Sequence, residues 1–521
     1  MATPRFGFTF KPRISLFNPF PNLFRKGRSC VLASLKKADD PEDFSQLSIK
    51  ELESSKTLTA VGDEQVKWKK VSSKALGVST SSIAQPIRVV LNGLKRKGHK
   101  VYLVGGCVRD LVLKRTPKDF DIITTAELKE VLRIFSHSHI VGKRFPICLV
   151  HVNDSVIEVS SFSTNARTWN EIPMDSDVED KLRWRNCLQR DFTINGLMFD
   201  PYEKLIYDYT GGFDDIKKAK VRTVSHSYIS FQEDCARILR GIRIAARLGF
   251  GLSKETAHSI KSLSTSVLRL DKGRLLMEMN YMMAYGSAEA SLRLLWKLGL
   301  LDFLLPLQAA YLVHRGFRRR DKGSNMVLSL LANMDKLLAP DKPCHSSLWV
   351  GILAFHMALS EHPRNPLVVS AFCLAVYNGG DLSEATNIAR SISRLHDETF
   401  EELIDPHNMD LQSLIDEILD FAESVVRALS KMTDGQYVYQ ALARYPEAPK
   451  SDLVFIPYHL YLRTCRIFEC VQEGKEKGFV LKHGSETDYE QLAAGSVQEL
   501  RQIFARIVFD TVYPLRLVQN K

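Results

Sequence analysis

Residues 101–123 carry side chains whose types and spacing suit phosphate and metal chemistry. The stretch begins with the apolar run Val-Tyr-Leu-Val, which predicts a buried strand, and Gly105 and Gly106 end it. A double glycine lets backbone N–H groups approach a ligand without a Cβ in the way, and such groups bind phosphate well. Arg109 follows at the start of a short helical segment, where its guanidinium can contact the same anion.

A second predicted strand, running from 119 to 123, supplies two carboxylates. Side chains at positions i and i+2 of a strand face the same way, so Asp119 and Asp121 point together while Phe120 faces the core. Paired carboxylates suit a hard divalent cation such as Mg²⁺, which prefers oxygen ligands and substrate phosphates. Either motif alone is most often a turn or a solvated acidic loop. Together they predict phosphoryl or nucleotidyl transfer.

This stretch resembles the catalytic motif of the class II nucleotidyltransferases, the group of bacterial-type poly(A) polymerases and tRNA CCA-adding enzymes. Four motifs follow the family's order, and the resemblance covers roughly residues 100–305. It implies Mg²⁺-dependent transfer of a nucleoside monophosphate to an RNA 3′-hydroxyl. In that reaction Asp119 and Asp121 hold the metal, and the triphosphate contacts are Gly105, Gly106 and Arg109.

The octet Gln-Arg-Asp-Phe-Thr-Ile-Asn-Gly at 189–196 resembles the family's Arg-Arg-Asp-Phe-Thr-Ile-Asn-Ala motif. The resemblance assigns Arg190 to the triphosphate, and it assigns Asp191 and Asn195 to the sugar hydroxyls, a contact that would separate NTP from dNTP. Gln189 stands where an Arg is expected, which removes one phosphate contact. Outside such an octet, Arg-Asp at a helix start is most often a cap or an ion pair.

Residues 233–250 predict a helix with chemistry of its own. Asp234 and Arg237 are three apart and therefore neighbours on one face. An Asp acceptor beside an Arg donor can read a base edge, and the resemblance implies that this pair selects the incoming base; an isolated pair of this kind is ordinarily a surface ion pair. Further arginines at helical spacing can meet phosphate or RNA: Arg240, Arg243 and Arg247.

Two segments between the motifs carry further candidates. Glu158, in a predicted strand, lies where the family has an acid beside the metal pair, so it is a candidate third carboxylate; a structural partner for an Arg is the alternative. The polar, acidic residues 165–186 predict a mobile loop at the mouth of the site, or a solvated insertion without a role.

The choice between two products rests on residues 140–152. They resemble the segment associated with poly(A) polymerases, and Lys143, Arg144 and His151 match it, whereas Pro146 and the spacing before His151 depart from it. A basic turn before a strand is the plain alternative. Asp-x-x-Arg serves both adenine and cytosine readers, so CCA addition is the second hypothesis. A catalytically silent RNA-binding paralogue, favoured by Gln189 alone, is the third.

The whole chain has the composition of an ordinary soluble protein, with 45% hydrophobic and 25% charged residues among 521. The net charge of +11 favours a polyanionic partner such as RNA. Nine cysteines without a Cys-x-x-Cys pair predict neither a zinc site nor a disulfide scaffold. No apolar run reaches the ~18–20 residues of a membrane span. The partners expected are therefore ATP, with CTP as the alternative, and an RNA 3′ end, with no membrane; the oligomeric state stays open.

Residues 1–38 contain no Asp or Glu and many basic residues among Ser, Pro and Phe. This composition predicts an organellar transit peptide, plastid first and mitochondrial second; a basic tail that contacts RNA is the other interpretation. The expected fold is α+β, a small mixed-sheet, polymerase-beta-like head followed by all-helical domains. Its expected regions are the transit peptide 1–38, a linker 39–84, the catalytic head 85–215, a helical nucleotide- and RNA-binding region 216–310, and a helical C-terminal region 311–521. A basic loop at 314–323 is a candidate RNA contact.

Overall fold

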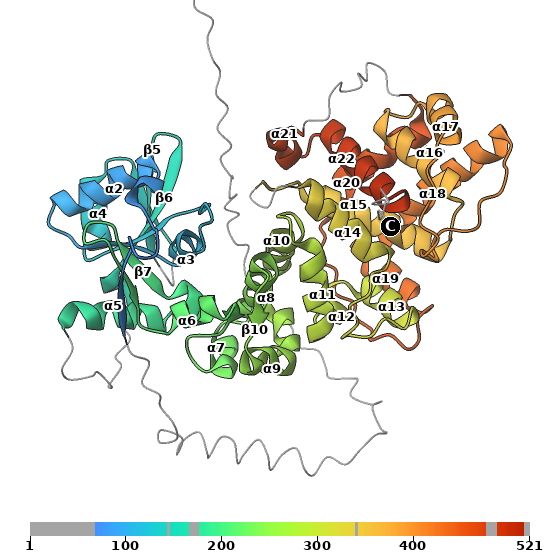
Figure 1. Ribbon diagram of the computed structural model, residues 1–521. Coiled ribbons are helices and arrows are strands. Elements are labelled where there is room, and N and C mark those ends of the chain that lie inside the picture. The colour runs from blue at the N-terminus through green and yellow to red at the C-terminus, as the bar shows by residue number, and fades with distance from the viewer. Residues whose placement is uncertain (1–67, 143–145, 166–176, 339–341, 476–486, 515–521) are drawn as a thin grey trace, which may run out of the picture. The chain divides into compact units, whose positions relative to one another are not determined.

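The computed structural model describes residues 68–142, 146–165, 177–338, 342–475 and 487–514 (Figure 1). The predicted transit peptide and most of the predicted linker lie outside these residues. Two compact units make up the chain. Among the described residues, the first holds 68–69, 79–102, 121–142 and 146–165, and the second holds 70–78, 103–120, 177–338, 342–475 and 487–514.

Eight strands form one mixed sheet in the order β1-β8-β7-β2-β3-β6-β5-β4. β3 and β6 are parallel, whereas the pairs β2/β7, β7/β8, β5/β6 and β4/β5 are antiparallel. β2 is divided between the units, with residues 101–102 in the first and 103–104 in the second. The strands are β1 (Lys69–Ser72), β2 (Val101–Val104), β3 (Asp121–Thr124), β4 (Ser138–Val141), β5 (Ile147–Val152), β6 (Ser155–Ser161), β7 (Leu197–Asp200) and β8 (Leu205–Asp208).

Helix α2 (Gln85–Arg96) of the first unit follows the apolar spacing of its sequence. Its buried side chains recur on one face, as an amphipathic helix on a sheet requires, and they are Ile87, Val90, Leu91 and Leu94. α4 (Leu128–Ile134) begins with a capping box between Glu127 and Glu130. Two short 3-10 helices, η1 (Thr80–Ser82) and η2 (Phe162–Asn165), complete this unit.

The second unit is mostly helical beyond its strands, which confirms the predicted α+β class. Its site-bearing elements are α3 (Gly106–Val112), α5 (Val178–Leu188), η3 (Thr193–Asn195), α6 (Gly212–Lys217), β9 (Lys220–Val221), α7 (Ser227–Glu233), α8 (Ala236–Leu248) and β10 (Gly251–Leu252). The helices that follow are α9 (Lys254–Ser262), η4 (Ser264–Arg269), α10 (Lys272–Met283), α11 (Ala288–Leu298), α12 (Leu301–Leu304) and α13 (Pro306–His314). The C-terminal helices are α14 (Met326–Leu337), α15 (Ser346–Glu361), α16 (Pro366–Tyr377), α17 (Leu382–Arg390), α18 (Leu411–Thr433), α19 (Gly435–Leu442), α20 (Tyr458–Glu473), α21 (Tyr489–Ala494) and α22 (Val497–Val512).

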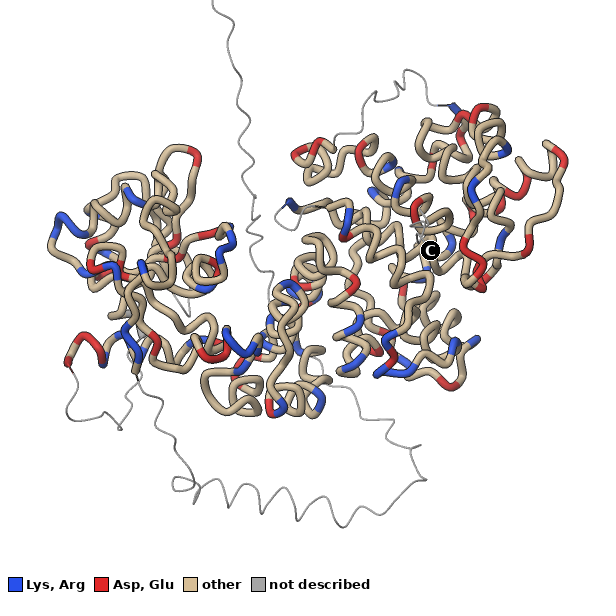
Figure 2. The backbone as a smooth tube through the Cα atoms, viewed as in Figure 1, with Lys and Arg blue, Asp and Glu red and all other residues tan. Residues whose placement is uncertain are grey.

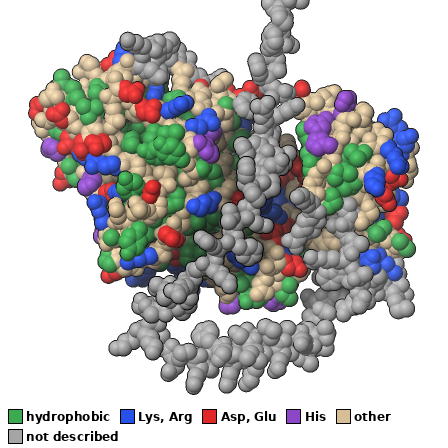
Figure 3. Space-filling model, turned by 180° about the vertical axis from the view of Figure 1, so that it is seen from behind, with side chains coloured by type: hydrophobic (Ala, Val, Ile, Leu, Met, Phe, Trp, Pro, Cys, Tyr) green, Lys and Arg blue, Asp and Glu red, His purple; other side chains and the backbone are tan. Residues whose placement is uncertain are grey.

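Aromatic side chains fill the core of the C-terminal helices. Phe372 and Phe421 are fully buried, with ring centroids 4.8 Å apart, and Phe355 packs edge-on against Phe504. Leu275, Met279, Met282 and Met283 of α10 are buried, as are Leu292 and Leu295 of α11, and the eight described cysteines are all buried. On the face shown in Figure 3, basic, acidic and hydrophobic side chains are interspersed. Among the described residues, no helix has the length and apolarity of a membrane span.

Four local predictions need correction. β3 begins at Asp121, so Asp119 lies outside the strand and the i, i+2 argument does not place it. Helix α8 begins at Ala236, and Asp234 ends α7 with an extended backbone instead of continuing one helix. Helix α5 (Val178–Leu188) takes up the end of the predicted loop 165–186 and extends beyond it, and β1 lies inside the stretch predicted as linker.

Asp180 on α5 is a buried structural acid and not part of a solvated loop. Its carboxylate accepts hydrogen bonds from Arg183 (2.7 Å), Tyr209 (2.5 Å) and Lys70 (2.8 Å). Burial alone would raise its pKa, but the bonds from Arg183, Lys70 and Tyr209 outweigh burial and lower the pKa to about 2. These contacts join α5 to the ends of β1 and β8.

Asp180→Asn is expected to lower the free energy of unfolding at pH 7 by about 2 kcal/mol, since each pKa unit corresponds to ~1.4 kcal/mol. Because the folded-state pKa is below the ordinary value of about 3.9, this stabilisation is present above that value and is lost as the pH falls toward 2. Urea unfolding of both proteins at pH 7 and pH 3 measures it. A difference that does not shrink at pH 3 would contradict the charge argument.

Candidate nucleotide-binding and metal site

The Gly-Gly turn ends β2 and begins α3. Gly105 has φ +82° and ψ −140°, a conformation that side-chain-bearing residues rarely adopt, so glycine is required there. Its amide donates to the carbonyl of Leu197 at 3.3 Å. The Gly105 N–H is therefore used by a hydrogen bond within the fold, contrary to the predicted phosphate contact. The prediction of a backbone contact to phosphate then applies only to Gly106, at the first turn of α3.

Arg109 on α3 joins two segments of the site. Its Nε and Nη2 donate to Oδ1 of Asp110 at 2.9 and 2.8 Å, and its Nη1 donates to Oδ1 of Asn195 at 2.7 Å. The side chains of Arg109 and Asp110 are only 11% and 17% exposed. The guanidinium is therefore fixed in position, as a preorganised anion contact must be.

Asp191 is the centre of this network. Its Oδ1 accepts from the amide of Phe192 (2.7 Å) and from Nδ2 of Asn195 (3.0 Å), and its Oδ2 accepts from Nη1 of Arg240 (3.1 Å). Burial alone would raise the pKa of Asp191, but the positive charge of Arg240 and these hydrogen bonds hold it below its ordinary value. The structure thus links Arg109, Asn195, Asp191 and Arg240, four residues that the sequence assigned to nucleotide binding.

Arg190 lies beside this network with an unsatisfied donor. The residue is half-buried, and its Nε is a buried atom without a hydrogen-bond partner among the described residues. A buried donor left unpaired is costly, so this position favours an acceptor from outside the described residues. A triphosphate oxygen is one such acceptor, and the role of Arg190 stays a prediction.

Asp234 and Arg237 are neighbours even though only Arg237 is helical. The Nε of Arg237 lies 3.9 Å from Oδ2 of Asp234. Arg237 also donates to Ser230 Oγ (2.8 Å) and to the carbonyl of Gln189 (3.4 Å), and Asp234 accepts from the Ala236 amide (3.1 Å). The bond to Gln189 holds the predicted base-reading pair against the 189–196 octet.

The candidate metal ligands in the first unit are Asp121 and Glu158. The two residues are partners in the parallel β3/β6 pairing, so their side chains emerge side by side on one face of the sheet. Asp121 is half-buried and Glu158 is exposed. Adjacent carboxylates of this kind fit a divalent cation. Asp119 is exposed and lies two residues before the strand; within the described residues, no cluster of three or more metal-ligating side chains is present.

Residues 101–222 match the family model described as poly(A) polymerase head domain. Residues 249–312 match a second one, described as a probable RNA and SrmB-binding site of polymerase A. These two regions of the chain are therefore similar to the head domain and the probable RNA-binding region of poly(A) polymerases. Arg109, Asp191 and Asn195 of the network, and the carboxylates of Asp121 and Glu158, lie within the matched residues 101–222. Arg240 follows them on α8.

The curated proteins similar to this chain include both poly(A) polymerases and CCA-adding enzymes. Poly(A) polymerase I of Haemophilus influenzae is 31% identical over 262 residues, which is 48% of this chain and 57% of that enzyme. The CCA-adding enzyme of Bacillus subtilis is 39% identical over 186 residues, 34% of this chain and 45% of that enzyme. The chain thus spans about half the length of the curated relatives it matches. A solved Bacillus stearothermophilus CCA-adding enzyme in complex with CTP is 21% identical, with a TM-score of 0.41, covering 75% of this chain and 94% of that one.

The segment that favoured poly(A) addition in the sequence, residues 140–152, is only partly described in the structure. Lys143 and Arg144 lie outside the described residues. His151 is on β5, and its ring stacks on that of His139 on β4, with centroids 5.3 Å apart. This contact explains how an aromatic ring is held at position 151, and it leaves the choice of product a prediction.

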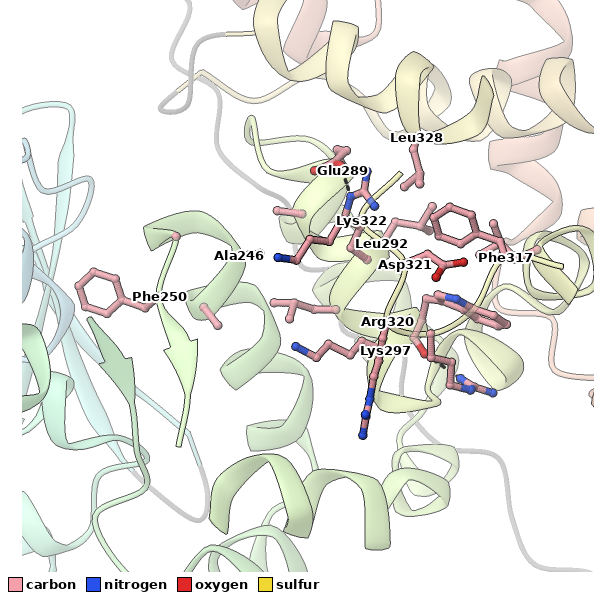
Figure 4. A pocket seen from close by; sticks show the side chains of 18 residues that line it. Ala246, Phe250, Glu289, Leu292, Lys297, Phe317, Arg320, Asp321, Lys322 and Leu328 are labelled. Carbon is pink, nitrogen blue, oxygen red and sulfur yellow. Dashed lines mark hydrogen bonds and ion pairs between the residues drawn. The ribbon is translucent and has the colours of Figure 1, made fainter. Parts of the chain in front are cut away.

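The basic loop at 314–323 borders a recess of about 760 Å³ in the second unit (Figure 4). Phe317, Trp296 and Leu328 contribute apolar walls, and Lys297 and Arg320 line it as well. Arg319 serves the fold, because it donates to Asp302 (2.6 Å) and lies over the Trp296 ring. An RNA contact by the other basic residues of this loop stays a hypothesis.

The sequence did not single out Asp208 as a structural centre of the head. Its carboxylate accepts from four successive backbone amides, those of Thr210, Gly211, Gly212 and Phe213, at 2.8–3.0 Å. An Asp two residues before a Thr-Gly-Gly turn is the signal that would have indicated it. This bonding fixes the turn between β8 and α6.

Proposed function

We propose that this protein is a template-independent RNA nucleotidyltransferase that transfers AMP from ATP to RNA 3′ ends. The observation that carries the proposal is the buried network from Arg109 through Asn195 and Asp191 to Arg240. It brings residues of α3, η3 and α8 together, and next to Asp191 the buried Nε of Arg190 has no hydrogen-bond partner in the part of the chain that the structure describes. Such a set of fixed donors suits a nucleoside triphosphate.

The residues divide the work as follows. Arg109 and Arg190 would bind triphosphate oxygens; Asn195 and Asp191 would orient the ribose; Asp234 and Arg237 would read the base edge. Asp121 and Glu158, together with Asp119, would hold a divalent cation, for which we propose Mg²⁺. When bound, that cation activates the RNA hydroxyl and neutralises charge on the phosphates. The protein's own contribution is positioning, which dominates phosphoryl transfer.

CCA addition is the second candidate, favoured by the 39% identity to the Bacillus subtilis CCA-adding enzyme. A bidentate base contact discriminates by ~1–3 kcal/mol, and the Asp234–Arg237 pair suits either an adenine or a cytosine reader. The preference for AMP addition rests on residues 140–152. The alternatives differ in their substrates, RNA of any sequence in one case and tRNA in the other.

One experiment separates these functions. The protein without residues 1–38 is incubated with Mg²⁺ and each NTP, using a tRNA that lacks its terminal CCA and an unstructured oligonucleotide. A long ladder with ATP alone on either RNA supports AMP addition. Three added nucleotides, requiring CTP and ATP and confined to the tRNA, would replace the first proposal with the second. No extension at all would favour the silent RNA-binding paralogue.

The cellular site is proposed from residues 1–38 alone. Their lack of acids and their basic, Ser-rich composition support import into an organelle, with the plastid first and the mitochondrion as alternative. A fluorescent protein carrying these residues at its N-terminus should enter plastids. Uniform cytosolic fluorescence would contradict the targeting proposal and leave the enzymatic one untouched.

A further inference from the structure

Two tyrosines at the end of α10 lie beside the arginines of α8. Tyr281 is in the last turn of α10 and Tyr285 follows just after it; their ring centroids are 5.5 Å apart and their planes are tilted by 38°. The guanidinium carbon of Arg243 lies 5.1 Å from the centroid of the Tyr281 ring. Tyr281 is 39% exposed, so its ring is accessible and is not fully used by the core.

The tyrosine pair is next to the loop that carries a candidate metal ligand. The Nζ of Lys118 lies 3.7 Å from the Tyr285 ring centroid, and Lys118 directly precedes Asp119. Burial raises the pKa of Tyr285, the neighbouring Tyr281 and Asp119 add to the rise, and Arg247 opposes it. The Tyr285 phenol is therefore within electrostatic reach of Asp119, inside the second unit.

At its other end the pair is connected to the nucleotide network. Arg243 pairs with the buried Glu278 at 3.3 Å, and one turn earlier on α8 Arg240 binds Asp191. Glu278 also accepts from Arg274 at 2.9 Å. A row of cations and aromatic rings thus leads from Asp191 to Asp119. Figure 2 shows basic positions along α8, in the middle of the chain.

Aromatic rings interleaved with cations are what a single-stranded nucleic acid binds, because bases stack on the rings and cations meet the phosphates. We propose that Tyr281 and Tyr285 form a stacking platform for the last unpaired bases of the RNA that is extended. This inference rests on the proposed function, and it says where on the protein the end of the RNA substrate binds. The incoming nucleotide is the less favoured occupant, because Asp234 and Arg237 already supply a base-reading pair.

The platform has a property that follows from its chemistry. A tyrosine ring stacks with any base, since every base has a π-face. The platform therefore holds the RNA end without selecting its sequence, and it should distinguish an end that carries bases from an end that lacks them. This property separates stacking from a general loss of charge or structure.

The test uses two fluorescent RNA oligonucleotides, one natural and one whose last two nucleotides lack bases, and measures their Kd for the full chain without Mg²⁺. Wild type is expected to bind the natural end about tenfold more tightly, in line with the loss per stacked base. The double variant Tyr281→Ala, Tyr285→Ala should bind both RNAs equally, at the wild-type affinity for the baseless one. Tyr281→Phe with Tyr285→Phe should behave as wild type, and Tyr437→Ala, an exposed tyrosine on α19, is the matched control.

Three results would overturn the platform. The double variant could keep the tenfold preference; wild type could show no preference; or the variant could raise the KM for ATP and leave RNA binding unchanged, which would place the incoming base on the rings. Extension assays on wild type keep the two proposals apart. A protein that does not extend RNA but loses base-dependent binding in the double variant would refute the transferase and support the platform.

Discussion

Replacing Asp121 with Asn is expected to lower the rate of nucleotide addition by about a thousandfold or more. Asp121 begins β3 directly opposite Glu158, and the change removes one anionic oxygen from the candidate cation site. Metal stabilisation of charge in phosphoryl transfer amounts to several kcal/mol, and each ~1.4 kcal/mol is a factor of ten in rate. Single-turnover extension of RNA with saturating ATP measures the effect.

Two comparisons make that result specific to the metal site. Asp154→Asn alters an exposed acid at the turn between β5 and β6 in the same unit and should leave the rate unchanged. Asp119→Asn tests whether Asp119 and Asp121 act as the predicted pair, because the strand register does not show where Asp119 lies. An equal loss of rate would assign Asp119 to the same cation. Wild-type rates in the Asp121 variant would remove this residue from the site.

Replacing Asp191 with Ala is expected to have the largest effect on stability, about 3 kcal/mol at pH 7. Removing one partner of a buried ion pair leaves the other charge without compensation, and here Arg240 and Asn195 both lose their acceptor. ATP affinity should fall as well, because Asn195 would no longer be held against Arg109. Urea unfolding and equilibrium binding of ATP measure the two effects.

The pH dependence of the Asp191 effect follows from its lowered pKa. The stabilisation is present above the ordinary carboxyl pKa of about 3.9 and is lost as the pH falls through the lower folded-state value. Asp191→Asn keeps one acceptor oxygen and should cost less than Ala. If the Ala variant were as stable as wild type, the network would not hold the site together.

Local sequence patterns predicted the helices and strands that depend on residues close together in the chain. The apolar spacing from Ile87 to Leu94 gave α2, and the Val-Tyr-Leu-Val run gave β2. The nucleotide-binding candidates were also identified by motif order, and four of them form one network. Motifs of this kind are short and contiguous, so one chain suffices to recognise them.

Such patterns do not predict contacts between segments that are distant in the sequence. Arg109 and Asn195 are 86 residues apart in the chain, and Arg240 and Asp191 are 49 apart. Asp180 looked like part of an acidic loop because its partners, Lys70 and Tyr209, come from other elements. Asp119 and Asp234 were misplaced by a few residues, since strand and helix ends depend on caps and ladder bonds that the apolar pattern does not encode.

The position of β1 has a practical consequence. β1 pairs with β8 at the margin of the sheet, and Ser73, just after it, donates its amide to the carbonyl of Lys204. A shortened chain beginning at residue 85, where motif resemblance alone would place the catalytic head, would leave β8 as a bare edge. Bare edge strands recruit strands from other molecules. Such a chain is expected to aggregate, whereas a chain that begins before Trp68 keeps β8 paired with β1.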